Sequence, residues 1–494
     1  MCETCNHFNG IDRRDFLKIS GSAVALGSLM GIDALAQNPN NSVKFRPLAK
    51  KKTKVAVVFM YPPADVVNAG KLEDAWAVDK WFTYPGNQYD PEMNHKKFQK
   101  KIEEIGVTCS LDLDFKGVIY TKAQLATFIE KMNAALPDAL LIVNFWNTFS
   151  PWSLEMTQKI KIPAIIYHPV GSSHQHPPKA LINAPGVVYI HSLENWEALE
   201  NALIAVNTKI ILKQSRVLRV TGVNEPTSAT DKNLGVDILA VPAEEYNAIF
   251  DSIATDNALR NEAMAFKAKA KAVIDVEDRY IIDGFRSRRA VSEIMKRYGA
   301  DAITITCLML KERKPCIAFS LNNSALIPSA CENWLDSALT MMAGVHLFRR
   351  AGFLHNPEFD IDRNQYYGAH CTCATSMYGP GKEELPFRIR PFTHQLPKTA
   401  AIDVEMKPGE KVFLTKYTAA ENKIFVYTGT MVGSPEMNVA GGCATRFVMD
   451  IDKADDICST YQGPHPILYF GNANEAKRMK MLAKLSRLEF VGNI

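Results

Sequence analysis

Short apolar runs alternate with amphipathic stretches of helical period from residue 53 to residue 212. The apolar runs cover residues 54–60, 107–113, 139–145, 162–168, 187–191 and 210–212. The amphipathic stretches cover residues 95–105, 122–135, 152–160 and 196–206. Strands alternating with helices predict a parallel, doubly wound α/β domain over residues 53–212. No Gly-x-Gly-x-x-Gly motif follows any of these runs, so dinucleotide binding is not indicated.

A second α/β series follows, and we assign residues 213–350 to it. Apolar runs at 216–222, 235–242 and 302–307 predict strands, and residues 243–298 predict a long helical region with a break at 283–284. Residues 316–320 are expected to form a strand that leads into a helix opened by Glu332.

The pattern changes again in the last part of the chain. Residues 401–405, 411–416, 423–430 and 445–451 alternate apolar and polar side chains between Pro-Gly and Gly-Gly turns. This alternation predicts antiparallel strands and a β-rich, barrel-like domain over residues 351–494. A helix at 476–487 and a strand at 488–491 are expected to close it.

The bulk composition is that of a soluble protein of two or three domains. The chain has 494 residues, of which 47% are apolar and 22% are charged. Its net charge of +4 is too small to indicate binding of nucleic acid or of an anionic membrane surface.

The N-terminus resembles a twin-arginine export signal. The pair Arg13–Arg14 precedes a mildly apolar stretch, and residues 34–36 supply a small-x-small cleavage pattern. We interpret residues 1–36 as the signal and residues 37–52 as a linker, so the twin-arginine machinery is an expected partner and the protein is expected in the periplasm or outside the cell. That route carries folded proteins, often with a cofactor loaded beforehand. The alternative is an amphipathic N-terminal helix.

Three polar residues stand out in the apolar second half of the chain: Glu332, His370 and His465. One carboxylate and two imidazoles make a ligand set for a divalent metal ion. Their separation means that only the fold brings them together. Taken singly, Glu332 also suits a helix N-terminus, and each histidine also suits a satisfied place in the core.

Four segments in order resemble the L-fucose isomerase and L-arabinose isomerase superfamily. They are residues 329–341 around Glu332, residues 368–372 around His370, residues 442–448, and residues 463–472 around His465. The resemblance implies two Rossmann-like doubly wound domains followed by a barrel-like domain. Over residues 53–300 it is a resemblance of architecture only.

The resemblance also implies a reaction and a cofactor. Members of that superfamily interconvert aldoses and ketoses through an enediol at a metal, usually manganese, held by two acidic residues and histidine. It therefore implies a divalent metal, Mn²⁺, a catalytic role for Glu332, and a sugar or polyol substrate. Asn356 stands where the second acidic ligand is expected; its amide oxygen can bind a hard cation but cannot transfer a proton. The resemblance-based ligand set is thus Glu332, Asn356, His370 and His465.

Other readings stay open beside the isomerase. A carbohydrate-binding member that lost the reaction, an epimerase or a lyase would suit the same residues, and a homo-oligomer is compatible with each. Two further places are candidates for substrate binding. His168, His174 and His176 lie in a loop after a predicted parallel strand, and Arg388 is placed to meet an anionic group; a solvated loop and a surface ion pair are the alternatives.

Overall fold

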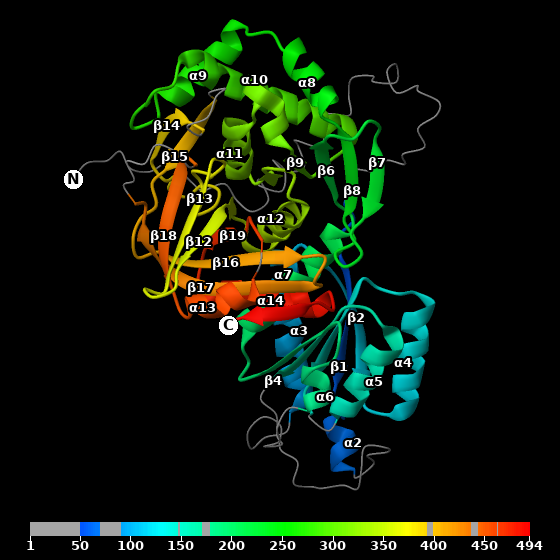
Figure 1. Cartoon of the computed structure of the whole chain (residues 1–494). Helices are drawn as coiled ribbons and strands as arrows, with labels where there is room; N and C mark the ends of the chain where they lie inside the picture. Colours follow the sequence, from blue (N-terminus) through cyan, green and yellow to red (C-terminus); the bar gives the residue numbers. More distant parts are fainter. Residues whose placement is uncertain are drawn as a thin grey trace, which may run out of the picture.

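The computed structural model describes residues 50–69, 90–146, 149–169, 178–392, 399–435, 443–461 and 463–494. The export signal and nearly all of the linker lie outside these ranges, and so do His174 and His176. The chain is a mixed α/β protein, as predicted, with two sheets built mainly from parallel strands and a larger sheet that is mostly antiparallel. In Figure 1 the first sheet forms a lower lobe, and the other sheets pack together above it.

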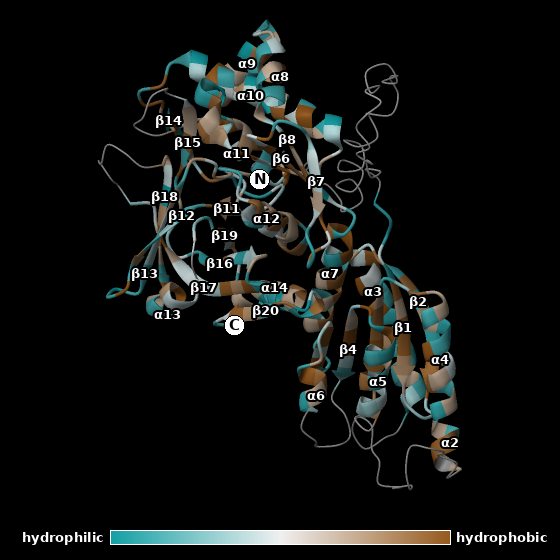
Figure 2. Ribbon diagram, turned by 45° about the vertical axis from the view of Figure 1, so that its right-hand side comes forward, coloured by the Kyte–Doolittle hydropathy of each residue, from teal (hydrophilic) through white to brown (hydrophobic). Residues whose placement is uncertain are grey.

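The first sheet has five parallel strands in the order β2-β1-β3-β4-β5. The strands are β1 (Lys54–Met60), β2 (Asp112–Ile119), β3 (Ala139–Asn144), β4 (Ala164–Pro169) and β5 (Val187–Ser192). The helices of this lobe are α2 (Ala64–Asn68), α3 (Pro91–Thr108), α4 (Lys122–Ala134), α5 (Ser150–Ile160), α6 (Lys179–Ile182) and α7 (Trp196–Leu212). Strands β3 and β4 are buried along their whole length, which follows because helices cover both faces of a parallel sheet. Figure 2 shows hydrophobic colouring along the β1 strand of this sheet.

The second sheet runs in the order β10-β9-β6-β8-β7, and only its edge strand β7 is antiparallel to its neighbour. Its strands are β6 (Arg216–Thr221), β7 (Thr227–Thr230), β8 (Asp237–Pro242), β9 (Ala302–Ile305) and β10 (Ser329–Ala330). Its helices are α8 (Ala243–Ser252), α9 (Asn257–Lys267), α10 (Asp278–Tyr298), the 3₁₀ segment η2 (Cys307–Arg313), α11 (Cys316–Ser324) and α12 (Leu335–Phe348).

Three details differ from the sequence predictions here. Residues 316–320 form the start of helix α11 rather than a strand, because a short apolar run has no period that separates a buried helix from a strand. The long helical region is broken twice, between α8 and α9 and between α9 and α10, and Gly284 lies inside α10, where a side chain would meet Ile317. Helix α12 begins at Leu335, so Glu332 precedes the helix instead of opening it.

The third sheet is mostly antiparallel, in the order β11-β19-β16-β17-β18-β13-β12, with β20 parallel to β17. Its strands are β11 (Phe353–Leu354), β12 (Asn356–Asp360), β13 (Gln365–His370), β16 (Lys411–Thr418), β17 (Lys423–Gly433), β18 (Thr445–Ile451), β19 (Ile467–Phe470) and β20 (Glu489–Gly492). The edge strands β11 and β12 are separated in the chain only by His355, so the sheet curls until its two edges meet. Beside it lie the two-stranded sheet of β14 (Phe387–Pro391) and β15 (Ala400–Val404), and the helices α13 (Ala454–Thr460) and α14 (Ala473–Leu485).

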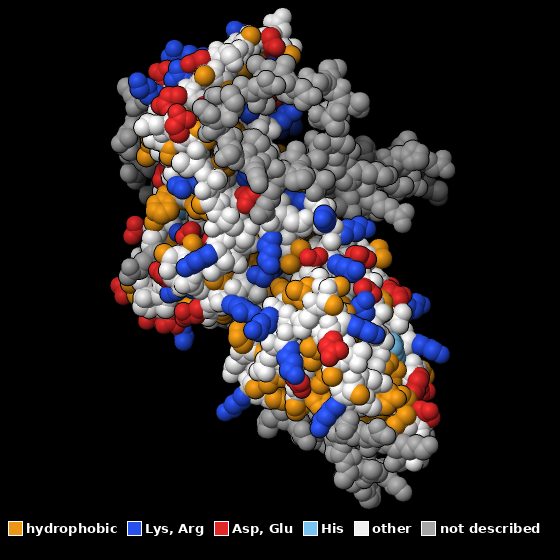
Figure 3. Space-filling view, turned by 90° about the vertical axis from the view of Figure 1, so that its right-hand side faces the viewer, with side chains coloured by type: hydrophobic (Ala, Val, Ile, Leu, Met, Phe, Trp, Pro, Cys, Tyr) orange, Lys and Arg blue, Asp and Glu red, His pale blue; other side chains and the backbone are white. Residues whose placement is uncertain are grey.

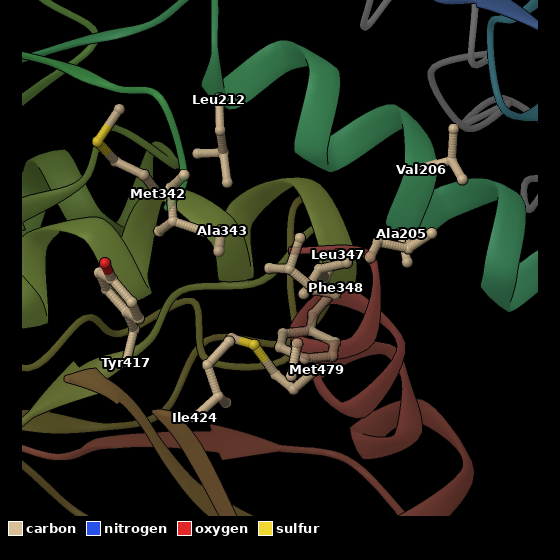
Figure 4. Close-up of a cluster of buried hydrophobic side chains, with 14 of the residues drawn as sticks. Ala205, Val206, Leu212, Met342, Ala343, Leu347, Phe348, Tyr417, Ile424 and Met479 are labelled. Atoms are coloured by element: carbon tan, nitrogen blue, oxygen red, sulfur yellow. The ribbon is translucent and has the colours of Figure 1, made fainter. Parts of the chain in front are cut away.

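Helix α12 is held in the core between the lower lobe and the curled sheet. In Figure 4 its residues Met342, Ala343, Leu347 and Phe348 face side chains of α7, β16, β17 and α14. Nearly all of α12 is buried. Burial of this kind contributes about 25 cal/mol per Å² of apolar surface, which fixes the helix and the turn that precedes it.

The surface carries both signs of charge. On the face shown in Figure 3, Lys and Arg side chains lie among Asp and Glu side chains over both lobes. Within the described ranges, no helix combines the length and the apolar character needed to cross a bilayer.

Candidate metal centre

Glu332, His370 and His465 come together at the junction of the second and third sheets. Glu332 lies in the turn between β10 and α12, His370 is the last residue of β13, and His465 precedes β19. Glu332 Oε1 is 3.8 Å from His370 Nε2, and Glu332 Oε2 is 3.5 Å from His465 Nε2. All three ligand atoms lie within 4.8 Å of one another. Three residues separated by up to 133 positions in the chain thus share one place, as the sequence predicted.

The imidazoles of this cluster have unsatisfied nitrogens. His370 Nε2 and both ring nitrogens of His465 are buried without a hydrogen-bond partner. Burial lowers the pKa of His370 and lowers the pKa of His465 to about 2, so both rings are neutral at physiological pH. Their contacts with Glu332 are therefore not salt bridges. Buried polar atoms without partners are rare, and neutral imidazole nitrogens are common metal ligands.

The geometry fits an ion between the three side chains. Ligand atoms bound to one cation at about 2.0–2.2 Å lie about 3.0–3.6 Å apart. The measured 3.5 and 3.8 Å separations exceed a good hydrogen bond but require a contraction of only a few tenths of an ångström to match. Burial raises the pKa of Glu332 to about 7, with a smaller contribution from Cys331, and a cation would offset that effect.

The backbone at the centre is held in an uncommon conformation. Glu332, Asn333 and His465 have φ values of 56°, 59° and 65°, in the left-handed region that non-glycine residues rarely adopt. Asn333 secures its turn: its Oδ1 accepts from Arg219 Nε at 3.0 Å and its Nδ2 donates to Thr221 Oγ1 at 3.2 Å. Such strain is kept where the surroundings determine it, often at functional sites.

Two residues beside the cluster were not singled out from the sequence. The Trp334 ring lies 5.3 Å from the His465 ring, and 36% of this residue is exposed. Lys416 Nζ donates to the Pro464 carbonyl at 2.6 Å and lies 5.4 Å from the Trp334 ring. Trp334 could have been found from the sequence, because it stands two positions after Glu332. Lys416 could not have been found in this way, because it lies inside an alternating strand.

Asn356 is not brought to the cluster. It begins β12, is exposed, and pairs directly with Ala369. Paired residues on antiparallel strands share a face, and neighbouring residues on one strand alternate. Asn356 therefore shares the face of Ala369, opposite to that of His370. Its neighbour His355 is buried instead, bonded to Tyr366 Oη and to the Phe353 carbonyl.

The remaining substrate-binding candidates lie elsewhere. His168 is the residue before the last in β4, a strand of the lower lobe (Figure 1). Its Nδ1 is 2.6 Å from the Asn144 carbonyl, and burial lowers its pKa to about 4. Arg388 lies on β14 with its Nε 3.5 Å from Asp403 Oδ2, the ion-pair alternative named above. His174 and His176 fall outside the described residues.

Comparisons with known proteins do not identify a family for this chain. No protein-family model matches the chain, and no curated protein matches it. Among solved structures, it is similar to a periplasmic solute-binding protein of an ABC transporter from Actinobacillus succinogenes, solved with bound D-allose. That match has 11% sequence identity and a TM-score of 0.17, and it covers 57% of this chain and 77% of the other.

Proposed function

We propose that Glu332, His370 and His465 bind a divalent metal ion, Mn²⁺ in the resting enzyme, and that this centre isomerises a sugar or polyol. The observation that carries the proposal is the convergence of one carboxylate on two neutral imidazoles with unsatisfied nitrogens. The family resemblance of the surrounding segments supports the reaction. The mixed α/β architecture, with two mainly parallel sheets and one mostly antiparallel sheet, also supports the proposal.

A bound divalent ion would polarise the substrate's carbonyl and hydroxyl oxygens and stabilise the negative charge of an enediolate. Among the described residues of the cluster, Glu332 is the group that can take up and return a proton. The two imidazoles fix the position of that carboxylate relative to the bound sugar. The exposed indole of Trp334 offers an apolar face to the C–H side of a sugar ring.

The Lys416 ammonium lies on the same side as Trp334 and is held by the Pro464 carbonyl. It is a second group able to donate a proton or a hydrogen bond to a substrate oxygen. Before export, the centre would be loaded in the cytoplasm and carried out folded by the twin-arginine route. This step rests on the sequence of residues 1–36.

The test is a panel of aldoses and ketoses with the full chain loaded with Mn²⁺. We expect isomerisation of at least one sugar, and loss of that turnover in Glu332→Gln without loss of folding. Glu358→Gln is the matched control, because Glu358 is a carboxylate on β12, the strand paired with β13, and lies outside the cluster. Full activity in Glu332→Gln, or failure of the folded chain to bind any divalent ion, would overturn the proposal.

A carbohydrate-binding protein without turnover is the second candidate. It is favoured by the single carboxylate of the described cluster, since Asn356 faces away and supplies no second acid. The two candidates differ in proton exchange. In deuterated water an isomerase incorporates deuterium at the carbon next to the carbonyl, whereas a binding protein leaves the sugar's NMR spectrum unchanged.

A further inference from the structure

Four buried thiols gather on the other side of His370. They belong to Cys307 at the start of η2, Cys316 at the start of α11, Cys331 after β10 and Cys371 after β13. Cys307 Sγ is 3.1 Å from Cys331 Sγ, and the Cys371 thiol contacts those of Cys316 and Cys331. The site described above uses none of them.

A single buried cysteine is usually an inert apolar residue, and this chain has examples. Cys109 lies in the core of the lower lobe, and Cys373 directs its thiol at the Ala374 carbonyl. The cluster differs because the thiols come from four separate elements and meet an imidazole. The Cys371 Sγ lies 3.6 Å from His370 Nδ1, the ring nitrogen opposite to the one that faces Glu332.

The spacing suits a tetrahedral soft-metal site. The ligand atoms of Cys331, His370 and Cys371 all lie within 4.8 Å of one another. Around Zn²⁺, with Zn–S of about 2.3 Å and Zn–N of about 2.0–2.1 Å, sulfur and nitrogen ligands lie roughly 3.6 Å apart and two sulfurs roughly 3.8 Å apart. The Cys371–His370 separation already has this value. Cys307 Sγ is 3.1 Å from Cys331 Sγ but lies outside this group, so it would have to turn away from Cys331 and toward Cys371 and His370 to complete the shell.

We propose that Cys331, Cys371 and His370, with Cys307 as the fourth ligand, form a second metal site that binds Zn²⁺. Three thiolates and one imidazole are an established ligand set for structural zinc. The ion would tie η2, the turn before Glu332 and the end of β13 together. A neutral imidazole has a single free lone pair, so His370 would have to release its ring proton to solvent in order to bind Zn²⁺ through Nδ1 and still present Nε2 as a ligand to the first site. Because the thiols are buried, the ion enters while the chain folds.

The two proposed metal sites share His370 but differ in the type of their other ligands. Loss of one site can therefore be distinguished from loss of the other. Full-length protein is produced in zinc-supplemented medium, dialysed against EDTA and analysed for metal. We expect about one Zn²⁺ per chain to remain in the wild type and in Glu332→Gln. We expect its loss in Cys371→Ser. Cys371→Ala is a second variant in case the serine hydroxyl disturbs the buried position, and Cys458→Ser on α13 is the control.

Production in cobalt-supplemented medium identifies the donor atoms. Thiolate bound to Co²⁺ gives a charge-transfer absorption in the near ultraviolet, which we expect in the wild type and Glu332→Gln but not in the folded Cys371 variants. The proposal is overturned if the folded wild type lacks this absorption. It is also overturned if the absorption survives in both Cys371 variants, or if thiol counting finds a Cys307–Cys331 disulfide in place of bound metal. Loss of sugar turnover alone would concern only the first site.

Discussion

The Ser337 hydroxyl donates a 2.6 Å hydrogen bond to the backbone carbonyl of His465. Ser337 lies in the first turn of α12, and both residues are buried. Helix α12 therefore holds His465 through this bond and Glu332 through the turn at its N-terminus. One rigid element sets the distance between the carboxylate and the second imidazole.

Ser337→Ala should weaken metal binding about 10-fold, the lower end of the range for residues that orient metal ligands. The buried His465 carbonyl loses its donor, and the left-handed backbone at His465 loses a restraint. Isothermal titration with Mn²⁺ measures the change. Ser459→Ala is the control, because the Ser459 hydroxyl also donates to a backbone carbonyl but on exposed α13. Equal affinity in wild type and Ser337→Ala would contradict this role.

Asn333→Ala should lower both stability and metal affinity. The change removes the hydrogen bonds to Arg219 and Thr221 and places alanine at a φ of 59°, which costs about 1–2 kcal/mol. Asn422→Ala is matched for strain, since Asn422 has a φ of 53° in a remote hairpin. Urea unfolding should report a loss in both variants, whereas Mn²⁺ titration should report a loss only in Asn333→Ala. Similar Mn²⁺ affinities in the two variants would show that the turn at Asn333 does not contribute to the metal site.

The regular parts of this architecture were predictable from the sequence. Short, nearly continuous apolar runs predicted β3 and β4, which are buried along their whole length. Partial alternation of apolar and polar residues predicted β16 and β18, although β16 is buried along nearly all of its length. Glu332, His370 and His465 were also predictable as a metal-ligand set, since their residue types stand out against apolar sequence.

The irregular parts were not predictable. The left-handed turn at Glu332 and Asn333 depends on partners in β6 that are more than 100 residues away in sequence. The face of the sheet on which the Asn356 side chain lies depends on strand register, and a shift of one residue reverses it. The thiol cluster could not be predicted either, because it forms only where four separate elements meet.

Asn356→Asp should leave metal affinity within about twofold of the wild type. The side chain shares the face of Ala369, opposite to that of His370, so a new carboxylate there adds no ligand, and an exposed substitution of this kind changes stability by less than about 0.5 kcal/mol. Competition titration with Mn²⁺ measures it. A tenfold or larger gain in affinity, or a gain in isomerase turnover, would show that residue 356 reaches the ion as the family resemblance implies.

Lys416 imposes a pH-dependent cost on folding. Burial lowers its pKa from 10.5 to about 8, and Asp336 and Glu421 offset only part of that effect. Between pH 8 and pH 10.5 the unfolded chain binds the proton more strongly than the folded chain, so stability rises with pH across this window. Below pH 8 both states are protonated and the cost is constant. At about 1.36 kcal/mol per pKa unit it amounts to about 3 kcal/mol.

Lys416→Met should therefore raise the free energy of unfolding by about 1–2 kcal/mol at pH 7. The relief of the desolvation cost exceeds the roughly 1 kcal/mol contributed by the hydrogen bond to the Pro464 carbonyl. Urea unfolding of both proteins from pH 7 to pH 10.5 measures the difference, and subtraction cancels the other lysines that titrate there. The gain should shrink steadily above pH 8, since the wild type then loses its buried charge. A difference that stays constant over this range would show that the Lys416 ammonium is not penalised in the folded chain.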